Sequence, residues 1–283
     1  MKSPDPLPAA TTSAPLVFIT GASSGIGQAL AARYYRAGWR LALVARRDTA
    51  LRAWTEAQRM DAARLAVYRA DVSDVASIGA AARGCLGAQG LPDVVIANAG
   101  ISLGIDTADA ADLELMRRTY ETNNLGMAAT FQPFLHALRE RRSGTLVGIA
   151  SVAGIRGLPG HAAYCSSKAA VISYCESLRG ECRPYGVRVV TLLPGYVATP
   201  LTRGNRYAMP FLLQPEDFAE RAFRAISAGA GRRVIPWQMA LVAALLRLLP
   251  NPVFDRLLAN RPRKQRAGSE SPPGAEHEGG QEP

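Results

Sequence analysis

The chain has 283 residues, enough to bury a large core within one α/β domain. Hydrophobic residues make up 48% of it and charged residues 20%, which is typical of a globular protein rather than a disordered one. The formal net charge of +10 would suit a nucleic acid, a membrane surface or a polyanionic cofactor. The Arg residues are dispersed along the sequence without a nucleic-acid motif, so nucleic-acid binding is not expected.

The cysteines and the ends of the chain say little about chemistry. Cys85, Cys165, Cys175 and Cys182 lack Cys-x-x-Cys spacing, so no metal site is expected. The first fifteen residues, 1–15, are rich in Pro, Ala, Ser and Thr and do not have the pattern of a signal peptide, which predicts a flexible arm. Reduced thiols in a cytoplasmic protein are the expectation, with Cys175 and Cys182 buried on one helix face.

Short apolar runs alternate with helix-length segments over most of the chain, and this predicts strands buried on both faces. The predicted helices include 25–37, 74–88 and 164–184. The repetition predicts an α/β fold of the Rossmann-like kind, a doubly wound parallel sheet in a single domain over 16–236. The predicted strands are 16–20, 41–45, 65–70, 94–97, 145–150, 187–193 and 233–236.

A glycine-rich turn, Thr20-Gly21-Ala22-Ser23-Ser24-Gly25-Ile26-Gly27, follows the first predicted strand and opens a helix. Gly21 is expected to make the turn, Gly25 to allow close approach of a pyrophosphate, and Gly27 to let helix and strand pack tightly. The helix N-terminus supplies free N–H groups and the positive end of a dipole. A plain glycine turn is the alternative, but the strand–turn–helix context favours a dinucleotide.

The end of the second strand bears on the choice of cofactor. An acidic residue there would bind the ribose 2′-OH of NAD, whereas Arg suits the 2′-phosphate of NADP. Ala45 and Arg46 occupy this corner, so NADP(H) is favoured over NAD(H). Asp48 is expected to cap the next helix. A solvated helix entry is the alternative for Arg46 and Arg47.

Further polar strand ends follow in chain order. Asp71, followed by Val72, is placed to accept from the adenine amino group, and Asn98-Ala99-Gly100 to let the chain pass beneath the adenosine ribose. Taken alone, each is only a strand-end turn.

Tyr164 and Lys168 are four residues apart and therefore share one helix face. A free phenol has a pKa near 10 and is a poor base at neutral pH. We expect the Lys168 ammonium, together with a positively charged nicotinamide, to lower the pKa of Tyr164. Ser151, just after the fifth strand, is placed to donate to a substrate oxygen. By itself, a Tyr-x-x-x-Lys pair is usually an ordinary helix surface.

In this order and spacing the motifs closely resemble the short-chain dehydrogenase/reductase family, over residues of about 16–200. Ala97, where a second Asn often stands, and Ser166, in place of a usual Ala, are small departures. The motifs are the turn Thr20–Gly27, Asn98–Gly100, Asn-Asn-Leu-Gly at Asn123–Gly126, Ser151, Tyr164-Cys-Ser-Ser-Lys168 and Pro194-Gly-Tyr-Val-Ala-Thr199.

The resemblance implies a role for each matched residue. Tyr164 would be the general acid/base, Ser151 the donor to the substrate oxygen, and Lys168 the residue that holds the ribose and relays the proton. Asn123, three residues before Gly126, would hold a water that extends the relay. Pro194, Gly195, Val197 and Thr199 would cradle the nicotinamide carboxamide. Homodimers or homotetramers are usual in such a family.

The substrate region is expected after Thr199. It contains Tyr196, Leu201, Tyr207, Met209, Pro210, Phe211, Leu212 and Leu213. These side chains favour an apolar ketone, aldehyde or secondary alcohol, while packing of a lid helix on the core is the equal alternative. The histidines need no catalytic role: His136 is expected in a helix, His277 in the tail, and His161 either at the mouth of the pocket or capping a helix.

The segment Val234–Leu249 is apolar almost all round but shorter than the roughly 20 residues that span a bilayer. Basic residues flank it: Arg232, Arg233, Arg256, Arg261, Arg263, Lys264 and Arg266. We expect a C-terminal helical extension over 237–267 and a disordered tail over 268–283. The extension would contact another subunit, cover the substrate pocket as a lid, or lie peripherally on a membrane.

Three functions therefore stay open. The first is an NADP(H)-dependent oxidoreductase that interconverts an apolar carbonyl compound and its alcohol, with Tyr164 moving the proton. The second is a ketoreductase of lipid-type substrates at a membrane face. The third is a dinucleotide-binding sensor without turnover, although the complete set Ser151, Tyr164, Lys168 and Asn123 speaks against it.

Overall fold

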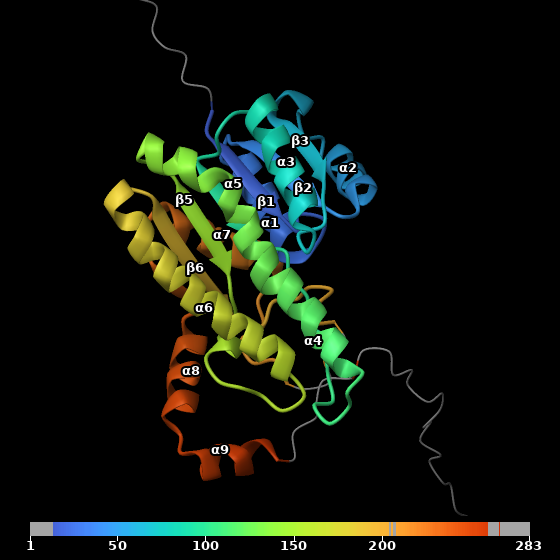
Figure 1. Ribbon diagram of the computed structural model, residues 1–283, viewed down its shortest axis with the longest axis vertical. Helices are drawn as coiled ribbons and strands as arrows, with labels where there is room; N and C mark the ends of the chain where they lie inside the picture. Colours follow the sequence, from blue (N-terminus) through green and yellow to red (C-terminus); the bar gives the residue numbers. More distant parts are fainter. Residues whose placement is uncertain (1–13, 204, 206–207, 260–265, 267–283) are drawn as a thin grey trace, which may run out of the picture.

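A parallel sheet of seven strands forms the centre of the molecule (Figure 1). The computed structural model describes residues 14–203, 205, 208–259 and 266. The strands lie in the order β3-β2-β1-β4-β5-β6-β7, so the order reverses between β1 and β4. They are β1 (Leu16–Thr20), β2 (Arg40–Ala45), β3 (Leu65–Arg69), β4 (Val94–Ala97), β5 (Thr145–Ile149), β6 (Arg188–Pro194) and β7 (Arg232–Ile235).

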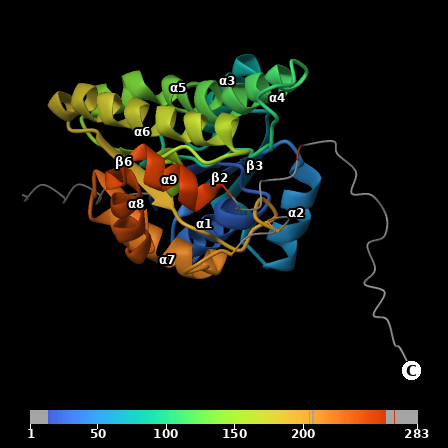
Figure 2. The same ribbon diagram turned by 90° about the horizontal axis from the view of Figure 1, so that it is seen from below.

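Helices cover both faces of this sheet, as Figure 2 shows. One face carries α3 (Val75–Ala88), α5 (Gly126–Arg141) and α6 (Ala162–Cys182), with α4 (Asp112–Tyr120) leading into α5. The other carries α1 (Gly25–Arg36), α2 (Asp48–Ala57) and α7 (Pro215–Ser227). The doubly wound α/β fold predicted from the sequence is confirmed.

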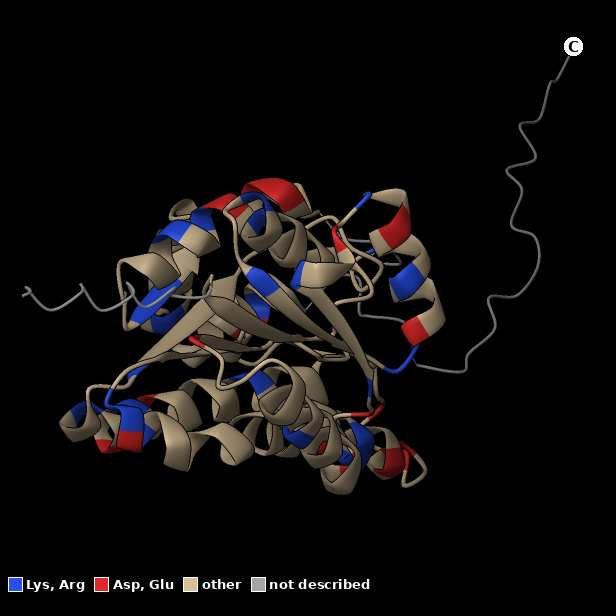
Figure 3. Cartoon of the chain, turned by 90° about the horizontal axis from the view of Figure 1, so that it is seen from above, with Lys and Arg blue, Asp and Glu red and all other residues tan. Residues whose placement is uncertain are grey.

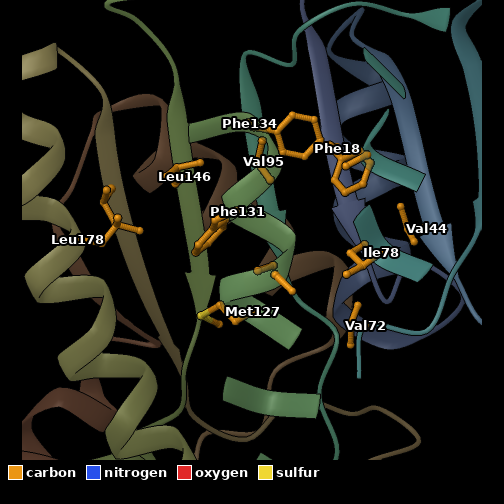
Figure 4. Packing of buried hydrophobic residues seen from close by; sticks show 14 of the residues in the cluster. Phe18, Val44, Val72, Ile78, Val95, Met127, Phe131, Phe134, Leu146 and Leu178 are labelled. Carbon is orange, nitrogen blue, oxygen red and sulfur yellow. The ribbon is translucent and has the colours of Figure 1, made fainter. Parts of the chain in front are cut away.

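Each face has its own hydrophobic core, because the buried strands alternate their side chains between the two. On the α3–α5–α6 face, Phe18 of β1 meets Phe134 of α5 edge to face, with ring centroids 4.9 Å apart (Figure 4). Cys175 and Cys182 are free and fully buried in the same cluster, as predicted. Charged residues of both signs are scattered over the outer helices rather than gathered in one stripe (Figure 3).

The predicted bounds of the strands are correct to within one residue at each end. The predicted burial of the strands is not correct throughout. The expected burial on both faces holds for the inner strands but is wrong for β3, at one edge of the sheet, and β7 at the other edge is also only partly buried. β3 is only partly buried, and Arg232 and Arg233 of β7 are exposed. An edge strand has a neighbour on one side only, so solvent reaches its side chains.

One predicted helix cap differs in the structure, and several predictions fall on residues that the structure does not describe. Asp48 does not cap α2: Arg47 occupies the N-cap position, and Asp48 begins the helix, 3.7 Å from the guanidinium of Arg52. A carboxylate in the first turn still benefits from the helix dipole. His136 is helical as predicted. Residues 1–13 of the predicted arm, the tail over 268–283 with His277, and Tyr207, Arg261, Arg263 and Lys264 lie outside the described residues.

The chain ends its described fold in two short helices, α8 (Gln238–Leu248) and α9 (Asn251–Leu258). Figure 1 shows them beyond the carboxyl ends of β5 and β6. Within the described ranges, no helix is long and apolar enough to cross a membrane.

Candidate active site

The glycine turn between β1 and α1 forms one end of the site. Gly21 and Gly25 have φ values of +67° and +55°, a left-handed conformation that other residues adopt only with strain. A Cβ on Gly27 would lie 2.2 Å from the carbonyl oxygen of Gly21, so α1 packs directly on the turn. The Ser24 N-cap makes no side-chain cap bond to α1. The first N–H groups of the helix are thus available to an anion.

Asn98 holds this turn against the end of β4. Its side-chain Nδ2 donates to the carbonyl oxygens of Thr20 at 3.0 Å and Gly21 at 3.2 Å. Its backbone N–H donates to the Thr20 hydroxyl at 3.1 Å. Asn98, Ala99 and Gly100 all line the site cavity. The structure therefore gives Asn98 a bracing role in addition to the predicted contact with the adenosine.

The predicted NADP corner lies at the ends of β2 and β3. Arg46 is exposed, and its guanidinium lies 3.7 Å from the carboxylate of Asp71. Burial opposes ionisation of Asp71, but hydrogen bonds from Ser73 and the charge of Arg46 outweigh it and lower its pKa. Arg46, Arg47, Asp71 and Val72 all line the cavity. Two cations thus stand at this rim beside one ionised carboxylate.

The predicted catalytic residues meet at the carboxyl end of β5. Lys168 is buried on α6, its Nζ donates to the carbonyl oxygen of Ile149 at 2.8 Å, and it lies 5.8 Å from the ring centroid of Tyr164. Ser151 accepts a bond from the Ala153 N–H at 3.1 Å, and its side chain is hydrogen-bonded to Tyr164. Ser151, Tyr164 and Lys168 all line the cavity.

The pKa of Tyr164 moves in the direction opposite to our expectation within the chain itself. Burial raises it to about 12, and the hydrogen bond with Ser151 only partly offsets that effect. Burial also lowers the pKa of Lys168 to about 8. Desolvation by burial therefore dominates the pKa of both groups in the protein without cofactor, and the lowering of the Tyr164 pKa by Lys168 together with a bound nicotinamide stays a prediction.

Asn123 lies behind this group rather than on the cavity wall. It is fully buried in a π-helical segment, Glu121–Leu125, between α4 and α5. Its Oδ1 accepts from the Ile101 N–H at 2.8 Å, and its Nδ2 donates to the Ile101 carbonyl at 3.0 Å and to the Ser167 hydroxyl at 2.9 Å. These bonds tie the segment after β4 to α6. The water-holding role stays a prediction, since the side-chain amide is already engaged by protein groups.

The segment after β6 closes the site from the other side. Pro194, Gly195, Val197 and Thr199 line the cavity, while their role in holding the nicotinamide carboxamide stays a prediction. A Cβ on Gly25 would lie 3.0 Å from the Cβ of Thr199, so this segment meets the glycine turn. A Cβ on Gly195 would lie 2.7 Å from Met239 Cγ, so α8 packs against the same segment. The segment after β6 is therefore in direct contact with the C-terminal helices.

One cavity of about 1150 Å³ is lined by all the predicted catalytic and cofactor-binding residues except Gly27 and Asn123. It runs from the glycine turn and Arg46 past Tyr164 to a wall that sequence analysis placed only in general terms. That wall consists of apolar side chains on α8 and α9: Met239, Val242, Ala243, Leu246, Phe254, Leu257 and Leu258. None of these residues belongs to a sequence motif. The sequence therefore indicated only that the segment is apolar, and not that it lines a cavity.

Only some residues of the predicted substrate region line the cavity, and the others pack against the core or are exposed to solvent. Tyr196, Leu201 and Pro210 line the cavity. Leu213 packs against the core below β6, and Phe211 and Leu212 are exposed. His161 lines the cavity, as predicted; it also occupies the N-cap position of α6, but its side chain makes no cap bond to the helix.

Arg156, which sequence analysis missed, fastens the C-terminal helices to the site. Its guanidinium donates to the carbonyl oxygen of Leu249 at 2.7 Å, to that of Leu246, and to Asn251 Oδ1 at 3.0 Å. It also lies 3.8 Å above the ring of Phe254. The loop between β5 and α6 is thereby tied to the end of α8 and the start of α9.

Comparisons with known proteins agree with this geometry. The family model described as "short chain dehydrogenase" matches residues 15–209. An "Uncharacterized oxidoreductase" of Myxococcus xanthus is 38% identical over 237 residues, covering 84% of this chain and 93% of that protein. A "Dehydrogenase/reductase SDR family member 7B" of Bos taurus is 32% identical and covers 90% of this chain and 84% of its own length.

Among solved structures, an alcohol dehydrogenase from the archaeon Thermococcus sibiricus, complexed with 5-hydroxy-NADP, is similar in fold. Its TM-score is 0.70 at 28% identity, with 79% of this chain and 96% of that chain covered. The chain belongs to the short-chain dehydrogenase/reductase family and is an NAD(P)-dependent oxidoreductase.

Proposed function

We propose that this protein is an NADP(H)-dependent reductase of an apolar ketone or aldehyde, which also catalyses the reverse oxidation of the alcohol. The observation that carries the proposal is the single cavity in which Tyr164 lies between the cofactor cradle and the apolar wall of α8 and α9. A substrate held in that cavity has its carbonyl end at Tyr164 and its apolar part against Leu and Met side chains.

The cofactor fits the residues present. The glycine turn leaves no room for side chains between strand and helix, which lets a pyrophosphate approach the backbone N–H groups. Arg46 and Arg47 at the rim suit the 2′-phosphate of NADP, and the Thermococcus sibiricus relative was solved with a derivative of that cofactor. When bound, the reduced nicotinamide would supply the hydride to the carbonyl carbon.

The proton goes to the carbonyl oxygen from the Tyr164 hydroxyl. A pKa of about 12 keeps this phenol protonated at neutral pH, which is the form that reduction requires. The Ser151 hydroxyl is placed to orient the same oxygen, and the Lys168 ammonium to favour the phenolate that remains after transfer.

The test is a panel of ketones and aldehydes of increasing chain length, followed at the nicotinamide absorbance with NADPH and NADH in parallel. Loss of the general acid in Tyr164→Phe should lower kcat by about 10²- to 10⁴-fold while cofactor affinity stays unchanged. Tyr174→Phe, on the same helix but partly exposed to solvent, is the matched control and should keep full activity. Unchanged turnover in Tyr164→Phe would instead support the sensor function.

A further inference from the structure

Helix α8 has two apolar faces, which packing on a sheet alone does not require. One face, with Met239, Val242, Ala243 and Leu246, lines the cavity. The opposite face carries Trp237 just before the helix and then Leu241, Leu245 and Leu248, which are 64%, 63%, 62% and 82% exposed. These four positions are four, four and three residues apart, the spacing that stacks side chains on one side of a helix.

Helix α9 continues this surface to the mouth of the cavity. Phe254 is buried over Arg156, whereas Val253 and Leu257 are exposed. Leu257 both lines the cavity and remains exposed, and so does Leu201 from the segment after β6. The opening between α9 and this segment is therefore rimmed by leucines. We call the exposed set the outer stripe: Trp237, Leu241, Leu245, Leu248, Val253 and Leu257.

The stretch of sequence that carries the outer stripe has charged residues that are almost all basic. Residues 232–266 contain eight basic residues and one acid, Asp255. Arg247 and Arg256 are exposed on the two helices themselves. Arg266 pairs with Asp109 and Asp112, so its charge is already engaged. An apolar surface with cations beside it complements the headgroups and upper acyl chains of an anionic bilayer.

A second copy of the chain fits this surface less well. A two-fold contact sets the same patch against itself, so Arg247 and Arg256 of both copies would be brought together with only one acid, Asp255, from each copy to offset them. The helices are also too short to cross a bilayer, since α8 has 11 residues and α9 has 8. They are suited to lie in its interface.

We propose that the outer stripe docks on an anionic membrane surface and that the cavity mouth at Leu201 and Leu257 receives its substrate from that surface. The first part stands on the exposed residues and their charge. The second part rests on the proposed function, and it implies an amphiphilic carbonyl compound whose alkyl chain lies along the inner face of α8. The two faces of this helix would then serve one path, from bilayer to Tyr164.

Docking is tested by flotation of the full-length protein with vesicles of phosphatidylcholine alone or mixed with phosphatidylglycerol. We expect at least about ten-fold stronger binding to the anionic vesicles, weakened by salt, because each Lys or Arg near such a surface contributes roughly five-fold. Lipid-contact quenching of Trp237 by brominated acyl chains should accompany binding. Equal, weak partitioning into both vesicles overturns the proposal.

Two variants locate the contact. Leu241→Gln/Leu245→Gln/Leu248→Gln should reduce vesicle binding at least about ten-fold, because three side chains no longer leave water. Leu113→Gln, an exposed leucine on α4, is the matched control and should bind as the parent does. Arg247→Gln/Arg256→Gln keeps the apolar stripe and should lose only the preference for anionic vesicles. The proposal is overturned if the triple variant binds vesicles as the parent does. It is also overturned if the parent self-associates and the triple variant loses only this self-association.

Delivery is measured separately from docking. A long-chain ketone dissolved in vesicles should be reduced several-fold more slowly by the triple variant, while a short water-soluble ketone should be reduced at the parent rate. Equal rates on the vesicle-borne ketone overturn delivery from the membrane. Failure of the parent to reduce any ketone contradicts the proposed function but leaves the flotation result standing.

Discussion

The two ends of the cavity are built in different ways. At the cofactor end, backbone meets backbone: a Cβ on Gly27 would lie 2.2 Å from Gly21 O, and one on Gly21 would lie 2.8 Å from Ala99 Cα. At the α8–α9 end the walls are leucine, methionine and alanine side chains, many of which also reach solvent. The first end accepts almost no change, whereas many apolar combinations satisfy the second. We therefore expect the rigid backbone geometry of the first end to position the cofactor, and the more adaptable packing of the second end to select the substrate.

The largest effect is expected from adding a single methyl group to the glycine turn at the rigid end of the cavity. In Gly27→Ala the new Cβ collides with the Gly21 carbonyl and with Asn98 Nδ2 at 2.6 Å, so the turn must open. Overpacking of this kind costs about 1–3 kcal/mol, and we expect NADPH affinity to fall by up to about a hundred-fold, measured by calorimetric titration.

Gly180→Ala is the matched control for that change. Gly180 lies exposed on α6 with nothing within 4 Å of an added Cβ. Alanine favours helix by about 1 kcal/mol over glycine, so this variant should be slightly more stable and bind NADPH normally. Equal affinities for the two variants would mean that the turn is not a rigid cradle.

Between the two ends, burial of Lys168 predicts a distinctive dependence of stability on pH. Its pKa is about 8 in the folded protein against 10.5 when solvated. Between these values the unfolded chain binds the proton and the native chain does not, so the free energy of unfolding rises with pH, by on the order of 3 kcal/mol in all. Below pH 8 the full cost of the buried cation is present.

Urea unfolding across this pH range checks the prediction by comparison of the parent with Lys168→Met. The rise should be missing from the variant, which is expected to be the more stable protein at neutral pH. Subtraction of the two curves removes the opposite trend from buried groups such as Tyr164, whose raised pKa lowers stability above pH 10. Parallel curves would show that Lys168 is solvated in the folded state.

A smaller effect is expected at the exposed rim of the cofactor end. Arg46→Ala removes charge-assisted hydrogen bonds to a 2′-phosphate, each worth about 1.5–3 kcal/mol, so KM for NADPH should rise about ten- to a hundred-fold. KM for NADH should stay the same. Arg52→Ala, one turn along α2 and also exposed, provides the control. Equal weakening of both cofactors would remove the basis for an NADP preference.

The same contrast explains what could be predicted from the sequence. The strands, the glycine turn, Ser151, Tyr164 and Lys168 were predictable because hydrophobic periodicity and fixed backbone geometry leave a pattern in the residues. The pKa direction of Tyr164 was not, because desolvation depends on everything packed around it. The role of α8 and α9 as a cavity wall could not be predicted either. The sequence of an apolar helix has the same pattern whether the helix faces a pocket, another subunit or a lipid.

Arg156 left no trace in the sequence for a related reason: its partners are mostly carbonyl oxygens, which every residue has. Those at the end of α8 lack partners within the helix, and the guanidinium satisfies two of them, Leu246 and Leu249. Its charge also lies at the negative end of the helix dipole. Arg156 thus attaches the end of α8 and the start of α9 to the loop after β5.

Arg156→Ala therefore tests whether that end depends on a single attachment. Loss of the carbonyl bonds and of the contact with Phe254 should cost about 1–2 kcal/mol, which makes local opening of α8 and α9 about five- to thirty-fold more frequent. Hydrogen exchange should speed up in these helices alone, and KM should rise several-fold for long ketones but not for NADPH. Arg156→Lys, with one donor group instead of a planar fork, should fall between the two proteins. Unchanged exchange in Arg156→Ala would mean that packing against Gly195 and the cavity wall suffices to hold α8 in place.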